Sequence, residues 1–85
     1  MHFVYILINA EKQLYIGETS DLNRRIKQHN QKEGKKRWTK GKGPWTLIQC
    51  EEFPNRTLAR KRETYLKSGW GRNWIKRHLL NSNLP

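Results

Sequence analysis

Short apolar runs separated by polar turns predict three β-strands along the 85-residue chain. The first run, Phe3–Asn9, is rich in β-branched and aromatic side chains and contains no glycine or proline, which is typical of a buried strand. A short polar segment separates it from Leu14–Thr19, so the two runs predict a β-hairpin. Trp45–Phe53 has the same apolar character and predicts the third strand.

Directly after the hairpin, the apolar residues show the spacing of a helix. Leu22 and Ile26 are four residues apart, which places them on the core-facing stripe of a helix that ends near residue 29. Arg25 and His29 show the same spacing beside that stripe, so we expect both at the border of the core, with His29 at the edge of any site formed there. Two side chains are suited to cap this helix: Ser20 or Asp21.

Two more helices are predicted in the C-terminal half of the chain. The first runs from about Thr57 to Lys67, with Asn55 as its cap and Gly69 placed to end it. Its apolar stripe consists of Leu58, Ala59, Tyr65 and Leu66. The last helix covers about residues 71–81. It places four side chains on one face, where the histidine is expected to be packed: Trp74, Ile75, His78 and Leu79.

These elements predict an α/β (α+β) fold in the order β-β-α-β-α-α. Because a sheet of only two or three strands is marginal, the helices must cover a three-stranded antiparallel sheet. No linker divides the chain, so residues 1–85 are expected to form a single domain. No apolar stretch approaches the roughly 20 residues of a membrane span, and no signal-peptide pattern is present. We therefore expect a cytoplasmic location and no membrane partner.

The charge of the chain indicates a polyanionic partner. The net charge is +11, from 18 Lys and Arg against 7 Asp and Glu. Nucleic acid is the obvious partner for such an excess, and charge alone leaves DNA and RNA open. Much of the positive charge lies in a glycine-rich basic loop, residues 31–43. Trp38 in this loop either fills the core, which we favour, or stacks on a base. Phosphate contacts are expected at Lys35, Lys36, Arg37, Lys40 and Lys42.

Cysteine and histidine usage argues against a zinc site. The single cysteine, Cys50, lies in an apolar strand and is expected to be a buried free thiol. Glu51 and Glu52 are adjacent on that strand and point to opposite faces, which makes them poor partners in one metal site. The three histidines match no ligand spacing: His2, His29 and His78.

The hairpin carries a tyrosine in each strand, within Phe3-Val4-Tyr5 and Tyr15-Ile16-Gly17. If odd residues pair with odd residues, the two tyrosines share a face, and in one such register Gly17 lies opposite Tyr5 and leaves space over its ring. Together with Arg25, His29 and a Glu63 within LARKRETYLKSG, this order resembles the GIY-YIG nuclease family, most of all its small stand-alone bacterial members. The departure is Phe3, which stands where the family has the first glycine.

The resemblance implies a role for each of these five residues. Tyr5 would act as general base or water-positioning group, assisted by Tyr15 and His29, while Arg25 would hold the phosphate and lower the pKa of the Tyr5 hydroxyl. Glu63 would bind a single Mg²⁺ or Mn²⁺. By spacing alone, an i,i+4 ion pair between Glu63 and Lys67 is an equal alternative for this carboxylate.

Two functions of different class follow. The first is a metal-dependent endonuclease that hydrolyses DNA, with a structure-directed role in repair or recombination as one option. The second is a basic nucleic-acid-binding module that has the nuclease fold and little or no activity. A chain of this size has no separate targeting domain, so its substrate would be read by structure or through a partner protein.

Overall fold

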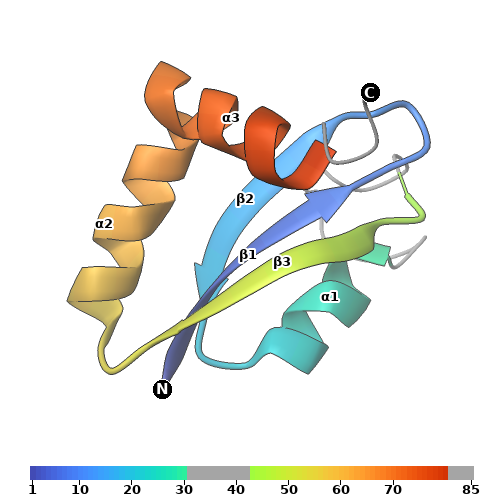
Figure 1. The fold of residues 1–85 in the computed structure, drawn as a ribbon. Helices are drawn as coiled ribbons and strands as arrows, with labels where there is room; N and C mark the ends of the chain where they lie inside the picture. Colours follow the sequence, from blue (N-terminus) through green and yellow to red (C-terminus); the bar gives the residue numbers. More distant parts are fainter. Residues whose placement is uncertain (31–42, 81–85) are drawn as a thin grey trace.

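The computed structural model describes residues 1–30 and 43–80, which form a three-stranded antiparallel sheet covered by helices. The strands are β1 (His2–Ile8), β2 (Leu14–Thr19) and β3 (Thr46–Phe53), and their order in the sheet is β2-β1-β3. Figure 1 shows β1 running between its two partners. The predicted α+β fold and its antiparallel sheet are confirmed.

The helices divide between the two faces of the sheet (Figure 1). Helix α1 (Leu22–Asn30) covers one face, and α2 (Arg56–Lys67) with α3 (Gly69–Ile75) covers the other. A π-helical segment, η1 (Lys76–Leu80), continues α3. Among the described residues, no helix has the length and apolar character needed to cross a bilayer.

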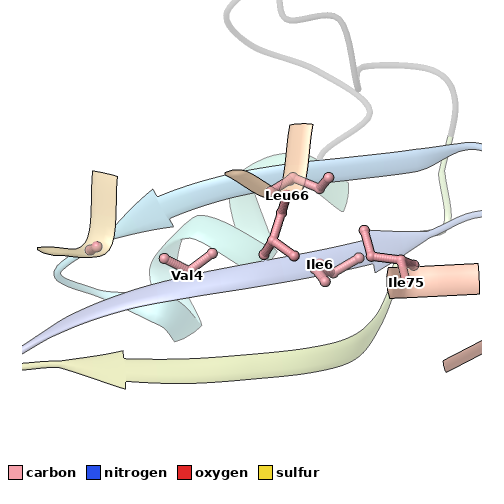
Figure 2. Close-up of a cluster of buried hydrophobic side chains, with 6 residues drawn as sticks. Val4, Ile6, Leu66 and Ile75 are labelled. Carbon is pink, nitrogen blue, oxygen red and sulfur yellow. The ribbon is translucent and has the colours of Figure 1, made fainter. Parts of the chain in front are cut away.

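Alternation along β1 sends its side chains into two separate cores. Val4 and Ile6 pack beneath α2 and α3, against Leu66 and Ile75, as Figure 2 shows. Fully burying a side chain of this size contributes about 1.5–3 kcal/mol. On the other face, Tyr5 and Leu7 join a second core, completed by Trp45 and by partly buried Tyr15, Leu22 and Ile26.

Side-chain caps set the ends of two helices as predicted. Asp21 Oδ1 accepts from the backbone N–H of Arg24 at 3.2 Å at the start of α1. Asn55 Oδ1 accepts from the N–H of Leu58 at 2.9 Å at the start of α2. These short polar side chains satisfy donors that the first helical turn leaves without a partner.

The predicted role of Gly69 was wrong. Ser68 ends α2 through its N–H, which donates to the Tyr65 carbonyl, and Ser68 also begins α3 by accepting from the N–H of Gly71 at 3.2 Å. Gly69 is therefore the first residue of α3, and the last helix begins earlier than expected. One serine that caps both helices allows a sharp turn between them.

Three side chains expected to be buried are exposed. Leu58 and Tyr65 are 41% and 42% exposed, because the sheet-facing stripe of α2 is narrow and is filled by Ala59 and Leu66. Cys50 is also exposed. It lies opposite Tyr5 on β3, an edge strand with a neighbour on one side only, so the apolar sequence around it does not bury the thiol.

Candidate active site

The hairpin register brings a glycine over the first tyrosine. Tyr5 pairs with Gly17 and Leu7 pairs with Tyr15, which confirms the odd-to-odd register and the shared face of the two tyrosines. A Cβ atom built on Gly17 would lie 2.5 Å from Tyr5 Oη and 2.7 Å from its Cζ. Only glycine leaves room here for the phenol ring, so Gly17 determines where the Tyr5 hydroxyl lies.

The Tyr5 hydroxyl bonds to a buried histidine from α1. Its Oη lies 2.8 Å from His29 Nε2, and both side chains are at most 1% exposed. The His29 ring lies 4.4 Å from the Tyr15 ring and 5.7 Å from the Tyr5 ring, centroid to centroid. The last turn of α1 packs the imidazole against both tyrosine rings, where it is buried. A place for His29 at the edge of an active site stays a prediction.

Two residues that the sequence reading did not assign to the site support this aromatic group. Trp45 meets the Tyr15 ring edge-on at 6.4 Å. The Asn30 side chain holds the Trp45 backbone, since Oδ1 accepts from its N–H at 2.6 Å and Nδ2 donates to its carbonyl at 3.3 Å. Asn30 follows His29 directly, so the same helix end fixes both the imidazole and the start of β3. No sequence pattern indicates this contact, because Asn30 and Trp45 are far apart along the chain.

Burial dominates the acidity of the Tyr5 hydroxyl. It raises the Tyr5 pKa well above its ordinary value, and Tyr15 raises the pKa further. Arg25 lowers the pKa of Tyr5 through its charge and a hydrogen bond, as predicted, but these effects are smaller than that of burial. The predicted direction of the Arg25 effect is therefore present, but burial outweighs it and the pKa of Tyr5 is raised. At neutral pH the hydroxyl keeps its proton and is able to donate it to His29 Nε2.

Arg25 links the buried tyrosine to an open polar pocket. Its side chain is half-buried and acts on the Tyr5 hydroxyl. The pocket, at the start of α1, has a volume of about 240 Å³. It is lined by Thr19, Ser20, Asp21, Arg24, Arg25 and Gln28. A guanidinium in this position can bind an anion that enters from solvent.

Glu63 lies on the flank of α2 that faces β2. At one end of that flank Arg56 Nε lies 3.2 Å from Glu18 Oε1 of β2. At the other end, Lys67 lines a second pocket of about 240 Å³ together with Tyr15. Glu63 is on the same flank, two turns after Arg56 and one turn before Lys67. Its carboxylate therefore faces edge strand β2, on the opposite face of the sheet from α1.

The ion pair considered for Glu63 is present. Glu63 Oε2 lies 3.2 Å from Lys67 Nζ, and the Glu63 side chain is 21% exposed, so it does not project into bulk solvent. Within the described residues, 1–30 and 43–80, no three His, Cys, Asp or Glu side chains lie close enough together to hold a metal ion. Any cation here would depend on this one carboxylate. Its convergence with the tyrosines and Arg25 on one surface stays a prediction.

The expected phosphate contacts of the basic loop lie outside the described residues. They concern Trp38 and the cations Lys35, Lys36, Arg37, Lys40 and Lys42.

Comparison with known proteins shows the family of the chain. The family model of the GIY-YIG catalytic domain matches residues 1–80. The chain belongs to the GIY-YIG family. This GIY-YIG chain is 45% identical to the UPF0213 protein CPE1444 of Clostridium perfringens over 67 residues, which cover 79% of this chain and 71% of that protein.

Other UPF0213 proteins are similarly related to this GIY-YIG chain. The UPF0213 protein HQ_3675A of Haloquadratum walsbyi is 42% identical over 67 residues, covering 79% of this chain and 74% of that protein. The solution NMR structure of the UPF0213 protein BH0048 from Bacillus halodurans has a TM-score of 0.55 and 35% identity, covering 89% of this chain and 82% of that one. The likeness supports both the fold and the family.

Proposed function

We propose that this GIY-YIG chain is a metal-dependent endonuclease that hydrolyses phosphodiester bonds in DNA. Membership of a catalytic-domain family of nucleases supports hydrolysis of a nucleic acid. The observation that carries the proposal is the 2.8 Å hydrogen bond between the Tyr5 hydroxyl and His29, with Arg25 acting on the same hydroxyl. A buried tyrosine bonded to a histidine and beside a fixed cation is suited to moving a proton next to an anion.

Arg25 binds the scissile phosphate in this proposal. Its guanidinium remains charged at every working pH and matches two phosphate oxygens at once. The polar pocket beside it provides the entry for the phosphate. As the water attacks and negative charge builds on the non-bridging oxygens, the fixed guanidinium stabilises that charge.

Tyr5 and His29 move the proton in this mechanism. Because burial raises the Tyr5 pKa, a tyrosinate is not available at neutral pH. The Tyr5 hydroxyl instead passes its proton to His29 Nε2 while it takes one from the attacking water. The water oxygen bonds to phosphorus while the bond to the leaving oxygen breaks. The leaving oxygen departs with the electron pair and takes a proton from solvent, and His29 later releases its extra proton to solvent. Tyr15 packs against both rings and holds them in this arrangement.

Glu63 fits a single hard divalent cation. Mg²⁺ in proteins commonly uses one or two carboxylates and completes its shell with water and phosphate oxygens. One carboxylate at the β2 edge meets that requirement for Mg²⁺ or Mn²⁺, provided that Lys67 gives up its ion pair. The bound ion would polarise the scissile phosphate.

A second surface among the described residues suits the nucleic-acid backbone. The outer face of α2 carries a shallow pocket of about 430 Å³ lined by Thr57, Arg60, Lys61 and Thr64. This face points away from buried Ala59 and Leu66. Hydroxyls and cations are the groups that contact phosphates without reading sequence. Phosphate contacts are therefore expected on α2 as well as on the basic loop. Binding and cleavage assays with RNA test whether it is also a substrate.

One observation favours the binding module as the second candidate. Tyr5 is completely buried, so a water molecule must reach its hydroxyl from the Arg25 side for catalysis to occur. If the domain does not open to admit water, it will bind nucleic acid without cleaving it.

Nicking of supercoiled plasmid separates the two candidates. We expect relaxed circles in Mg²⁺ or Mn²⁺ and none in EDTA. Glu63→Gln keeps the size of the side chain and removes its charge, so cleavage should fall by several powers of ten while DNA binding is kept. Arg25→Ala should weaken both. Wild-type cleavage by Glu63→Gln would refute the metal assignment, and binding without nicking in either metal would favour the binding module.

A further inference from the structure

An aromatic side chain on α3 is left almost entirely in solvent. Trp70 is 79% exposed, the largest exposed fraction of any large hydrophobic side chain in the described ranges. Trp74 lies one helical turn later, and His78 lies four residues beyond it on η1. Single exposed hydrophobic residues are common, but an exposed tryptophan at the end of an aromatic row indicates a binding surface.

The rings beside Trp70 are held in fixed positions. His78 stacks on Trp74 with ring centroids 4.8 Å apart and planes 21° apart, and its Nδ1 lies 3.0 Å from the Trp74 carbonyl oxygen. The Arg62 guanidinium lies 4.8 Å from the Trp74 ring and 5.3 Å from the Tyr65 ring. We call the group formed by Tyr65, Trp70, Trp74 and His78 with Arg62 the aromatic strip.

An ion pair fixes Arg62 within the aromatic strip. Arg62 donates two hydrogen bonds to the Glu51 carboxylate on β3, at 2.7 and 3.0 Å. Arg62 therefore lies on the β3 flank of α2, whereas Glu63 lies on the β2 flank. The aromatic strip is thus separate from the candidate active site.

The charge around the aromatic strip favours an anionic ligand. From Thr64 to Leu80 the sequence contains no acid and four Lys or Arg residues. Lys67 and Arg72 line the pocket on the β2 side, whereas Lys76 and Arg77 lie between Trp74 and His78 along the chain. Glu51, which contacts the strip, is paired with Arg62. An exposed tryptophan beside stacked rings and cations matches a nucleic acid whose bases are free to stack, whereas a duplex would offer it only backbone.

We propose that the aromatic strip binds unpaired bases of a single-stranded nucleic-acid segment, with Trp70 as the outermost stacking ring. The inference rests on the proposed function, because it takes nucleic acid as the ligand. It adds a substrate class: nucleic acids that contain a single-stranded stretch. Base stacking tolerates every base, so the strip would select for strandedness and not for sequence.

Fluorescence anisotropy of a labelled oligothymidylate of about 12 nucleotides measures single-strand binding by the strip. EDTA in the buffer prevents cleavage during the measurement. A blunt-ended duplex, which has no unpaired bases, serves as the reference ligand. Trp70→Ala should weaken single-strand binding roughly five- to 150-fold, the effect of losing one base–aromatic stack, and leave duplex binding and the salt slope unchanged. Trp70→Phe keeps a flat ring and should retain most of the affinity. Trp70→Leu keeps apolar bulk only and should resemble Trp70→Ala.

Unchanged single-strand affinity in Trp70→Ala, or equal affinity of Trp70→Phe and Trp70→Leu, would overturn the proposal. If the molecular mass of the wild-type protein in solution rises with concentration and Trp70→Ala abolishes this rise, the strip is instead a contact between two copies of the chain. If the wild-type protein binds neither ligand, the proposed function fails as well. If it binds both ligands and nicks plasmid, while Trp70→Ala changes nothing, only this inference fails.

Discussion

Tyr5 combines a structural and a chemical role in one side chain. Its ring belongs to the core beneath α1, and its hydroxyl bonds to His29 at 2.8 Å. Gly17 makes this possible, because any side chain there would meet the phenol oxygen. The residue is thus held by packing from all sides, which fixes the hydroxyl and also raises its pKa.

Replacing Tyr5 by Phe should remove chemistry and leave the fold. We expect cleavage to fall by about 10²–10⁴-fold, the usual contribution of a positioned proton-transfer group. DNA affinity should not change, since the charged contact of Arg25 remains. The lost hydrogen bond should cost about 1 kcal/mol in unfolding free energy. Nicking rates, filter binding and urea unfolding of the variant measure the three effects, and a fully active Tyr5→Phe protein would refute the assignment.

Comparison of the wild-type protein with Tyr5→Phe measures how much stability the Tyr5 hydroxyl loses at alkaline pH. The folded pKa of Tyr5 is raised above the unfolded value of about 10. Its contribution to stability is therefore complete below about pH 10 and is lost as the pH rises from there towards the folded pKa. Wild-type protein should lose more stability than Tyr5→Phe between pH 9 and about pH 11. Parallel urea titrations at the two pH values measure the difference, and equal losses would contradict the raised pKa.

At the scale of elements, α2 has a different environment on each of its sides. Its buried stripe packs on Val4 and Ile6, one flank faces β2 with Glu63, and the other faces β3 with Arg62. The outer face carries hydroxyls and cations. Since the 12-residue helix is rigid, its angle on the sheet positions both the carboxylate proposed for the metal and the guanidinium of the aromatic strip.

The contact between α2 and α3 depends on Gly71. A Cβ atom there would overlap the Tyr65 carbonyl oxygen and the Leu66 backbone, which have no room to move. Gly71→Ala should therefore lower the free energy of unfolding by roughly 1–3 kcal/mol, the usual cost of overpacking a core. Gly69→Ala is the matched control, because nothing lies within 4 Å of its added Cβ, and it should be neutral or slightly stabilising. Urea unfolding of both variants tests this, and equal stabilities would show that α3 is not docked this closely.

At the scale of the whole molecule, the net charge of +11 should control affinity. The logarithm of DNA affinity should fall linearly with the logarithm of salt concentration, by about 0.9 for each phosphate neutralised. Replacing Arg60 and Lys61 together with Ala should lower that slope by up to about 1.8 for all sequences alike. Lys27→Ala, on exposed α1 surface, is the control and should leave the slope unchanged.

A parallel variant locates the remaining contacts. Joint replacement of Lys35, Lys36 and Lys40 in the basic loop should lower the slope in the same way. Comparing the two variants in salt titrations shows how phosphate contacts divide between α2 and the loop. Binding that does not respond to salt in the wild-type protein would contradict both assignments.

Local rules in the sequence determined the secondary-structure elements. Apolar runs predicted three strands, and short polar side chains predicted the caps at Asp21 and Asn55. The face shared by Tyr5 and Tyr15 was predicted for an odd-to-odd register only. These features depend on neighbours a few residues apart, which the sequence displays directly. Gly17 opposite Tyr5 does not belong with them, because the sequence allowed more than one hairpin register and the structure selected this one.

Only the tertiary structure decided which of these groups are buried and what they touch. It buried His29 against two tyrosine rings and left Cys50 and Tyr65 exposed. It also raised the Tyr5 pKa, although the charge of Arg25 lowers it. It also placed Glu63 and Arg62, adjacent in sequence, on opposite flanks of α2. Burial and electrostatic environment depend on how helices from distant parts of the chain dock on the two faces of the sheet, and no local periodicity contains that information.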